Sequence, residues 1–322
     1  MASLDGNAAR RASGSGVRPR RASRAWRIAA ALAALLLAWP GVICARAIRT
    51  ALRDLYPVRA PVDREAAARS GLRDVTFQAA DGVTLRGWFR PPVNGATVVL
   101  AHGWGGSRQQ MLSHAAVLVR NGFGVLLFDF RAHGESGGRM TTSGDREQLD
   151  VSAAVSFASR QPGVRPERLG AVGYSMGGTA LVEVAARDHS FAALMLEAVP
   201  PTLEEDMRAD YQRGRPLAPL VGFLVYRLAG VDVHGPRPID RLCGLGPRPV
   251  LLVYGTEDPA FPAAVGRRML AAACAPKELW VVPGGGHGGF LELAPDEFER
   301  RMVGFFSASL VAAPARAPPA GK

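Results

Sequence analysis

Apolar runs of four to six residues alternate with amphipathic stretches from residue 96 onward, and this alternation constrains the fold more than any other feature. Such continuous runs are typical of parallel strands that are buried on both faces. A βαβ series predicts an α/β fold, with an open, mostly parallel sheet flanked by helices. The expected strands span 96–101, 124–129, 169–174, 192–197, 249–254 and 279–282, and the expected helices span 108–121, 146–160, 176–187, 260–273 and 294–310.

Two further features complete the expected domain, which we place at residues 72–310. Strand-like runs at 74–79 and 83–88 flank Asp81-Gly82, which predicts a hairpin of antiparallel strands at one edge of the sheet. An insertion at about 200–245 interrupts the alternation and contains helix-like stretches at 202–213 and 217–229. We interpret it as a small helical lid above the carboxyl ends of the strands, where α/β sheets bind ligands. The alternative is a loop remote from the site.

The N-terminal part contains an uncharged stretch at residues 28–45. Eighteen helical residues at about 1.5 Å each just span a bilayer core, which predicts a transmembrane anchor. Seven Arg against one acid in residues 1–27 favour a cytoplasmic N-terminus, and hence a single-pass bacterial membrane protein with its catalytic domain outside the cytoplasm. A cleaved signal peptide stays open, because Pro40-Gly41 should break the helix and Ala45-Arg46-Ala47 resembles a cleavage site. Removal of residues 1–47 would give a secreted protein; a buried soluble helix is the third reading.

The remaining segments carry most of the excess charge. Residues 1–27 are expected to be a disordered basic tail, 46–71 a juxtamembrane linker, and 311–322 a disordered Pro/Ala-rich tail. The formal net charge is +11, of which residues 1–27 carry +6 and the residues after 310 carry +2. Because only +3 is left for the body, no basic surface for nucleic acid is expected.

The three cysteines show no metal-ligand spacing and no disulfide framework. Cys243 and Cys274 each precede one of two neighbouring predicted strands, so a bridge between them stays open. We expect instead two small buried thiols. The sequence indicates no metal and no cofactor.

The segment Gly173-Tyr174-Ser175-Met176-Gly177 lies between an expected strand and an expected helix. A serine on such a sharp strand-to-helix turn projects its hydroxyl from the sheet, and this context is what makes a G-x-S-x-G match informative. Glycines at 173 and 177 remove side chains that would collide with the turn. Ser175 is therefore the candidate nucleophile.

A neutral serine needs a base, and that base needs a carboxylate to fix its tautomer. His287 follows the last expected strand within a glycine-rich loop, which allows its imidazole to reach over the sheet. Asp258 follows the strand 249–254 and is the preferred acid, with the adjacent Glu257 as the alternative. Nucleophile, acid and base thus occur in the order Ser175, Asp258, His287.

An oxyanion formed at this serine needs two backbone N–H donors. Met176 directly follows the nucleophile and should supply one of them. The second should come from the loop after strand 96–101, with Trp104 preferred and Gly103 as the alternative. His102 in the same loop is expected to bond to the backbone and hold the turn.

The segment Asp129-Phe130-Arg131-Ala132-His133-Gly134-Glu135-Ser136 is a second polar cluster at a strand end. Asp129 precedes the serine in the chain, and this order argues against its being the acid partner of His287. We interpret the cluster as a network that braces the loop, with Arg131 as a potential substrate contact.

The chain resembles the α/β-hydrolase superfamily over roughly residues 72–310, since five motifs occur in the family's order. They are His102-Gly103, Asp129-x-Arg131-x-His133-Gly134-x-Ser136, Gly173-x-Ser175-x-Gly177, Gly255-x-x-Asp258 and Gly286-His287. The second is most similar to the bacterial esterase, thioesterase and dipeptidyl-peptidase-like branch, including membrane-anchored Bem46-type serine hydrolases. The resemblance implies an α/β-hydrolase fold, a Ser175, Asp258 and His287 triad, and cofactor-free hydrolysis of an ester, thioester or amide. The chain lacks the β-propeller of prolyl-oligopeptidase-type enzymes, which argues against endopeptidase activity.

Carboxylesterase- or lipase-like activity is therefore the expected function. An acyltransferase or a cofactor-free haloperoxidase would use the same residues, whereas a full Ser, Asp and His set argues against a non-catalytic binding protein. The substrate side is less constrained. One interpretation is that Trp104, Met176 and an apolar lid bind a small molecule with an apolar acyl group. The alternative is that these are ordinary packing residues. The lid residues in question are Leu220, Val221, Phe223, Leu224 and Val225.

Overall fold

The computed structural model describes residues 24–211 and 218–312, with the side chains of 34–37 and 210 left out of the description. The chain divides into two units, Met1–Ile43 and Cys44–Lys322. The disordered tails expected over 1–27 and 311–322 lie outside the described residues, except for 24–27 and 311–312. Residues 24–27 already belong to the first helix.

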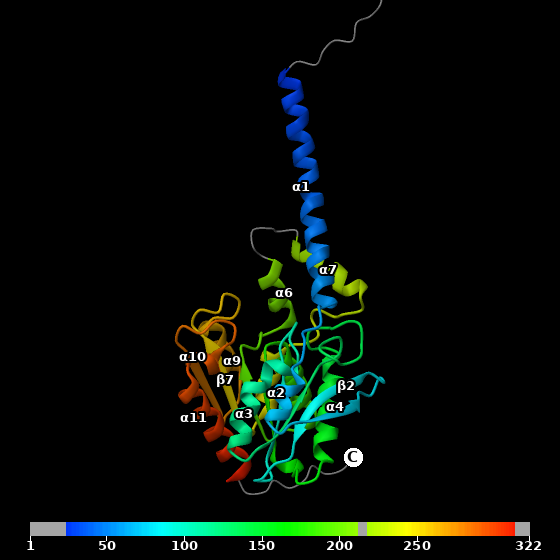
Figure 1. Cartoon of the computed structure of the whole chain (residues 1–322). Helices are drawn as coiled ribbons and strands as arrows, with labels where there is room; N and C mark the ends of the chain where they lie inside the picture. The colour runs from blue at the N-terminus through cyan, green and yellow to red at the C-terminus, as the bar shows by residue number, and fades with distance from the viewer. Residues whose placement is uncertain (1–23, 212–217, 313–322) are drawn as a thin grey trace, which may run out of the picture. The chain divides into compact units, whose positions relative to one another are not determined.

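Among the described residues of the second unit, eight strands form one central sheet (Figure 1). The strand order is β1-β2-β4-β3-β5-β6-β7-β8, in which β1, β2 and β4 pair antiparallel and the later neighbours pair parallel. The mostly parallel sheet and its antiparallel edge hairpin are thus confirmed. The strands are β1 (Arg73–Gln78), β2 (Thr84–Arg90), β3 (Thr97–Ala101), β4 (Gly124–Phe128), β5 (Leu169–Tyr174), β6 (Ala193–Glu197), β7 (Val250–Gly255) and β8 (Lys277–Val282).

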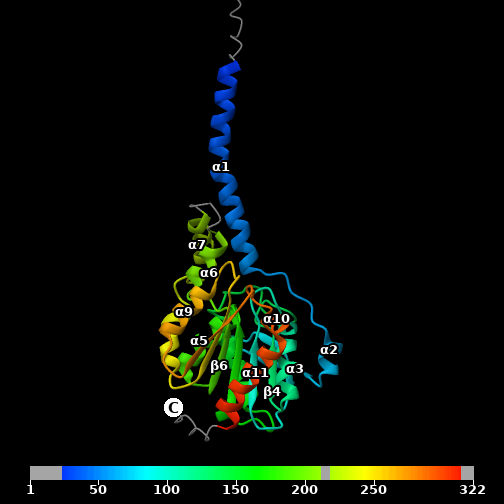
Figure 2. The ribbon, with the colours of Figure 1, turned by 90° about the vertical axis from the view of Figure 1, so that its left-hand side faces the viewer.

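Helices cover both faces of this sheet (Figures 1 and 2). α4, α5 and α9 contribute to the core on one face, and α3 and α11 to the core on the other. All residues of β3, β4 and β6 are buried, which explains their continuous apolar sequences. The helices are α1 (Arg24–Leu55), α2 (Arg64–Arg69), α3 (Leu112–Arg120), α4 (Glu147–Ser159), α5 (Met176–Asp188), α6 (Leu203–Tyr211), α7 (Ala218–Leu228), α8 (Pro238–Arg241), α9 (Ala263–Ala272), α10 (Phe290–Leu293) and α11 (Pro295–Phe306), with 3₁₀ turns η1 (Arg108–Met111), η2 (Pro166–Arg168) and η3 (Leu242–Leu245) and the π-helical turn η4 (Ser307–Val311).

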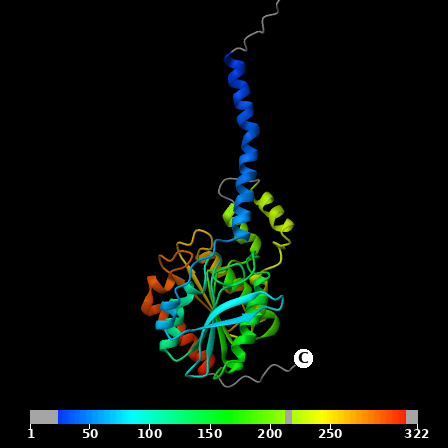
Figure 3. The same cartoon turned by 45° about the vertical axis from the view of Figure 1, so that its right-hand side comes forward.

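The carboxyl ends of the parallel strands meet at one edge of the sheet. The insertion expected at 200–245 contains α6 and α7, which lie beyond this edge (Figure 3, yellow-green). The two helices pack together: a Cβ built on Gly222 of α7 would lie 2.8 Å from the Tyr211 ring of α6. The predicted helical insertion is therefore present at the predicted place in the fold.

Helix α1 differs from expectation because it continues through Pro40 and Gly41. A proline removes a single intrahelical hydrogen bond, and the many bonds on either side keep a long helix continuous. Within the described residues, α1 is the one helix long and apolar enough to cross a membrane. A signal sequence near the N-terminus would meet the same criteria.

The residues expected to form a linker pack onto the domain instead. The second unit begins at Cys44, well before the predicted domain start at Leu72. Ala47, Ala51 and Leu55 recur every four residues along α1 and are buried. Arginines and threonine between these positions hide the short apolar face in the sequence, which explains the wrong boundary.

Cys243 and Cys274 form a disulfide, so the expectation of two free buried thiols is wrong. Cys243 lies in η3 just before β7, and Cys274 lies just before β8. These two strands are neighbours, which brings the two Cα atoms to 4.5 Å from each other. The alternative that the sequence left open, a bridge between the segments before these strands, is therefore the one that forms.

Replacing both bridged cysteines with serine should lower the free energy of unfolding by about 3–4 kcal/mol. The bridge closes a loop with a sequence separation of 31, and its loss frees that loop in the unfolded chain. Urea unfolding followed by circular dichroism measures the change. Cys44→Ser is the control, because Cys44 is a free cysteine and its replacement should leave the midpoint nearly unchanged. Equal midpoints for the double variant and the unaltered protein would contradict the prediction.

Candidate active site

Ser175 occupies a sharp turn between β5 and α5. Its backbone adopts φ 49° and ψ −119°, a conformation that costs energy in a residue with a side chain. A Cβ on Gly173 would lie 2.5 Å from the Gly178 Cα, and a Cβ on Gly177 would lie 2.4 Å from the Ala101 carbonyl oxygen. The glycines predicted to permit this turn are therefore required by close backbone contacts.

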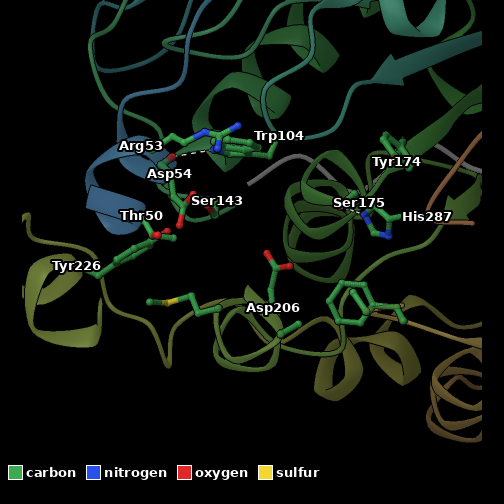
Figure 4. Close-up of a pocket in the computed structure, with 14 residues that line it drawn as sticks. Thr50, Arg53, Asp54, Trp104, Ser143, Tyr174, Ser175, Asp206, Tyr226 and His287 are labelled. Atoms are coloured by element: carbon green, nitrogen blue, oxygen red, sulfur yellow. Dashed lines mark hydrogen bonds between the residues drawn. The ribbon is translucent and has the colours of Figure 1, made fainter. Parts of the chain in front are cut away.

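His287 lies beside Ser175 and Asp258, although the three residues come from distant parts of the chain (Figure 4 shows Ser175 and His287). The His287 Nδ1 atom is 2.7 Å from Asp258 Oδ2, and its Nε2 atom is 3.0 Å from Ser175 Oγ. With the Nδ1 proton donated to the carboxylate, Nε2 is left to accept the serine proton. The structure thus brings together all three residues that the sequence singled out.

Asp258 is held by its own loop after β7. Its Oδ1 atom accepts hydrogen bonds from the N–H groups of Ala260 at 2.8 Å and Phe261 at 3.0 Å. Burial by itself would raise the pKa of Asp258, but the hydrogen bonds from His287 and these amides lower the pKa below its usual value. The carboxylate therefore stays ionised and orients the imidazole. Glu257, the alternative acid, is exposed and does not occupy this place.

The lowered pKa of Asp258 also links the site to stability. A carboxyl with a lower pKa in the folded than in the unfolded state stabilises the fold above its unfolded pKa. This contribution is lost as the pH falls through the folded-state pKa. Acidification therefore weakens the loop that carries the acid.

Trp104 lies in the loop after β3, where its neighbours' N–H groups are already engaged. Among the residues that the structure describes, none accepts a hydrogen bond from the Trp104 N–H. The acceptors for its neighbours are Gln110 Oε1 for Gly103, His133 Nε2 for Gly105 and the Gly103 carbonyl for Gly106. This pattern favours Trp104 over Gly103 as an oxyanion donor. Met176 is the first residue of α5, where helical N–H groups have no intrahelical acceptor.

His102 holds the turn, as expected. Its Nδ1 donates to the Gly103 carbonyl at 2.7 Å, and its Nε2 accepts from the Phe130 N–H at 3.1 Å. Burial lowers the pKa of His102 to about 3, so the ring is neutral and can serve as an acceptor. Both nitrogens are used within the scaffold and leave the residue no part in proton transfer.

The cluster at 129–136 braces its loop, which confirms one expectation and corrects another. Arg131 is only 4% exposed and pairs with Asp150 and Asp81, each at 2.7 Å. It is not among the residues that line the pocket beside Ser175, so the expected substrate contact is wrong. The Arg131 guanidinium is hydrogen-bonded to two carboxylates. Both lie outside the segment 129–136, so that segment alone does not predict them.

Asp129→Asn should lower the free energy of unfolding by about 3 kcal/mol. The Asp129 carboxylate accepts hydrogen bonds from the guanidinium and the N–H of Arg108, and both side chains are buried. Removing the negative charge leaves the guanidinium with Glu135 as its remaining close carboxylate. Chemical unfolding compares this variant with Asp296→Asn, an exposed carboxylate whose loss should cost less than about 0.5 kcal/mol. Similar losses in both variants would contradict the bracing role.

A pocket of about 400 Å³ opens beside Ser175 and His287 (Figure 4). Its walls come from the end of α1, from the helical insertion, and from loops at the carboxyl edge of the sheet, so the insertion does form one side of the pocket. The lining residues are Thr50, Arg53, Asp54, Trp104, Ser143, Tyr174, Ser175, Asp206, Met207, Ala209, Tyr226, Ala260, Phe261 and His287.

The apolar lid residues expected to face an acyl group do not line this pocket. Leu220 is 64% exposed and Leu224 is 55% exposed, which also rules out core packing for these two. The insertion instead contributes Asp206, Met207 and Ala209 from α6 and Tyr226 from α7. The apolar composition of α7 is evident in the sequence, but the orientation of the helix depends on its contact with α6.

The end of α1 forms a wall of the pocket that the sequence analysis does not predict. The Trp104 indole N–H donates to the Asp54 carbonyl at 2.7 Å (Figure 4), and the Tyr211 hydroxyl lies 3.4 Å from an Asp54 carboxylate oxygen. The Thr141 N–H donates to the Leu55 carbonyl at 2.9 Å. The signal available in the sequence was the four-residue spacing of Ala47, Ala51 and Leu55.

Ser143 presents a further polar group in the pocket from a strained backbone, with φ 52°. The buried Glu147 carboxylate holds this loop by accepting hydrogen bonds from the hydroxyls and amides around it. Its donors are the Thr141 and Thr142 hydroxyls and the N–H groups of Thr142 and Gly144.

Across the described residues, no group of three or more His, Cys, Asp or Glu side chains is arranged to hold a metal ion.

Comparison with known proteins agrees with this geometry. The Alpha/beta hydrolase family matches residues 98–301. An uncharacterized protein of Mycobacterium tuberculosis is 33% identical over 235 residues, covering 72% of this chain and 78% of its own. The uncharacterized protein YfhR of Escherichia coli is 27% identical over 244 residues, covering 73% and 81%. The chain therefore belongs to the α/β hydrolase family, and fold and family together indicate a hydrolase.

A solved structure shows the same fold. The Pyrococcus furiosus esterase Pf2001 superposes with a TM-score of 0.68 and 24% sequence identity, covering 80% of this chain and 98% of the esterase. At this identity the similarity establishes the architecture, and the reaction has to be argued from the site.

Proposed function

We propose that this protein is a serine hydrolase that cleaves carboxylic esters through an acyl-enzyme on Ser175. The observation that carries the proposal is the continuous hydrogen-bonded series from Ser175 Oγ to His287 and on to the Asp258 carboxylate. It stands at a strained turn beside an open pocket, which is the arrangement that activates a serine for acyl transfer.

In the first half of the reaction, Ser175 Oγ attacks the ester carbonyl carbon while His287 Nε2 takes the hydroxyl proton. The carbonyl oxygen becomes an oxyanion, which the N–H groups of Met176 and Trp104 stabilise. Collapse of the tetrahedral intermediate breaks the bond to the alcohol, and His287 gives its proton to the departing alkoxide oxygen. Each oxyanion donor is worth about 3–4 kcal/mol of transition-state stabilisation in comparable enzymes.

In the second half, water attacks the acyl-enzyme. His287 now takes a proton from the water, and a second oxyanion forms in the same place. When this intermediate collapses, the proton passes to Ser175 Oγ and the carboxylic acid is released. Asp258 keeps the imidazole in one tautomer through both halves and stabilises the imidazolium by its negative charge.

The pocket lining favours a substrate with both an apolar and a polar part. Trp104, Met207 and Phe261 offer apolar surface, whereas Arg53, Asp206 and Ser143 offer charged and hydroxyl groups. We therefore place the acyl group of a small-molecule ester among the apolar side chains and its polar portion toward the end of α1.

We further propose that the enzyme acts outside the cytoplasm, held to a bacterial membrane by α1. The apolar part of α1 supports an anchor or an uncleaved signal segment. The disulfide between Cys243 and Cys274 supports an oxidising compartment, since such bonds are rare in the bacterial cytoplasm. Membrane fractionation combined with protease protection of intact cells tests both parts of this placement.

The proposed reaction is tested with the purified full-length protein and p-nitrophenyl esters of increasing acyl length, each paired with the matching anilide. We expect hydrolysis of short and medium esters at rates well above those of the anilides. The Ser175→Ala protein, purified in parallel, controls for contaminating esterases. Absence of hydrolysis for every ester, or equal rates for both proteins, would contradict the proposal.

A further inference from the structure

Helix α7 exposes a row of large apolar side chains. Leu220, Leu224 and Leu228 recur every four residues and are 64%, 55% and 79% exposed. The opposite side of the same helix is fixed in the protein, because Gly222 and Tyr226 are buried. One exposed leucine needs no explanation, but three on one helix face form an apolar stripe that water disfavours.

A second exposed row is formed by Ile48 and Leu52 at the end of α1 and by Tyr56, the residue directly after the helix. These residues also recur every four positions and follow directly after the buried Ala47, Ala51 and Leu55. Both helices contribute to the pocket beside Ser175: α1 through Thr50, Arg53 and Asp54, and α7 through Tyr226. The two apolar rows therefore belong to helices that also form walls of the pocket.

Positive charge accompanies the two rows. Arg46, Arg49 and Arg53 on α1 and Arg227 on α7 are exposed. None of the four makes an ion pair with any residue that the structure describes. The only acid in these parts of the two helices is Asp54, which is partly buried and lies within reach of the Tyr211 hydroxyl. Apolar side chains flanked by unpaired arginines suit the interface of a bilayer that carries anionic phosphate groups.

We propose that this surface, comprising the α7 row, the α1 row and the four arginines, docks onto an anionic phospholipid bilayer. Continuity along the chain supports this occupant, because Ile48 follows the uncharged segment 28–45 by less than one helical turn. The arginines meet lipid phosphates, and the leucines of α7 enter the boundary between headgroups and acyl chains. This contact is additional to any anchoring by residues 28–45, because it engages the catalytic domain itself.

Docking has a consequence for the substrate, and this part rests on the proposed function. With α7 and the end of α1 at the lipid surface, the pocket between them receives molecules that reside in the bilayer. The substrate class is then an amphiphilic ester, with its acyl part drawn from the membrane and its polar part toward Arg53, Asp206 and Ser143.

The docking is tested on the full-length chain in nanodiscs of phosphatidylcholine with and without phosphatidylglycerol. A Leu224→Cys variant in a Cys44→Ser background carries an environment-sensitive fluorophore on α7. We expect a blue shift of its emission and strong quenching by nitroxide-labelled lipids, both larger with phosphatidylglycerol. The matched control is Val93→Cys in the same background, which is 89% exposed and lies just before β3, at the opposite edge of the sheet.

A label at position 224 that is quenched no more than a label at position 93 would overturn the docking. Equal quenching with and without phosphatidylglycerol would overturn the preference for anionic lipid. Neither readout requires an active enzyme, so both hold even if the proposed reaction fails.

The substrate consequence is tested with a Leu220→Ser, Leu224→Ser and Leu228→Ser protein. These side chains lie outside the pocket, so the rate on a water-soluble ester should match that of the unaltered protein. The rate on an ester held in vesicles should fall roughly tenfold or more, because less apolar surface enters the bilayer. Equal losses on both substrates would refute delivery from the membrane, whereas an unaltered protein inactive on every ester would refute the proposed function instead.

Discussion

Ser175→Ala should lower kcat for the best ester by about 10⁵- to 10⁶-fold, because only substrate binding and the oxyanion hole then contribute to catalysis. The substitution removes Ser175 Oγ, which lies 3.0 Å from His287 Nε2, so no acyl-enzyme can form. The fold should be unaffected, since alanine accepts the same turn and fills less space. Stopped assays at high enzyme concentration, with circular dichroism to verify folding, measure the change.

Ser156→Ala is the control for the loss of a serine hydroxyl. Ser156 is exposed on α4 and does not line the pocket, so this variant should hydrolyse the ester at an unchanged rate. A Ser175→Ala protein that retains more than about a hundredth of the activity would show that another group attacks the ester, given the size of the loss expected for a nucleophile.

Asp258→Asn should lower kcat by about 10⁴-fold while KM changes little. The amide occupies nearly the same space but offers an N–H to the imidazole where the carboxylate accepted one, which favours the wrong tautomer of His287. The negative charge that stabilises the imidazolium in the transition state is also lost. Steady-state kinetics of the purified variant measure both parameters.

The adjacent acid provides a matched comparison for this substitution. Glu257 is exposed, and Glu257→Gln removes the same charge one residue away. This variant should retain nearly full activity. If both variants lost activity to the same degree, a general effect of negative charge near the pocket would replace the specific hydrogen bond as the explanation.

The strands and the three clustered residues were predictable because their signals are local. A strand such as β3 is buried on both faces, so its apolar run appears directly in the sequence. Ser175 and His287 stand in glycine-rich loops at strand ends, where family resemblance and strand order agree. The choice of Asp258 over Glu257 depended on more, namely the amides of Ala260 and Phe261 that hold its carboxylate.

Features that depend on contacts between distant segments were not predictable from pattern. The neighbouring strands left a bridge between Cys243 and Cys274 open, but its formation depends on how closely the segments before β7 and β8 approach. The pocket wall at Asp54 requires Trp104 to meet the end of α1. The lid shows the same limit. Its apolar composition was evident, yet the packing of α7 on α6 turns Leu224 away from the pocket and toward solvent.

The central claim, that Ser175 is the acylated nucleophile, is tested most directly by locating a covalent adduct. The full-length protein is treated with a fluorophosphonate, digested, and examined by peptide mass spectrometry. The account predicts a phosphonyl group on the peptide that contains Gly173-Tyr174-Ser175-Met176-Gly177, with fragment ions assigning it to Ser175. An unmodified Ser175, or an adduct on a different serine, would contradict it.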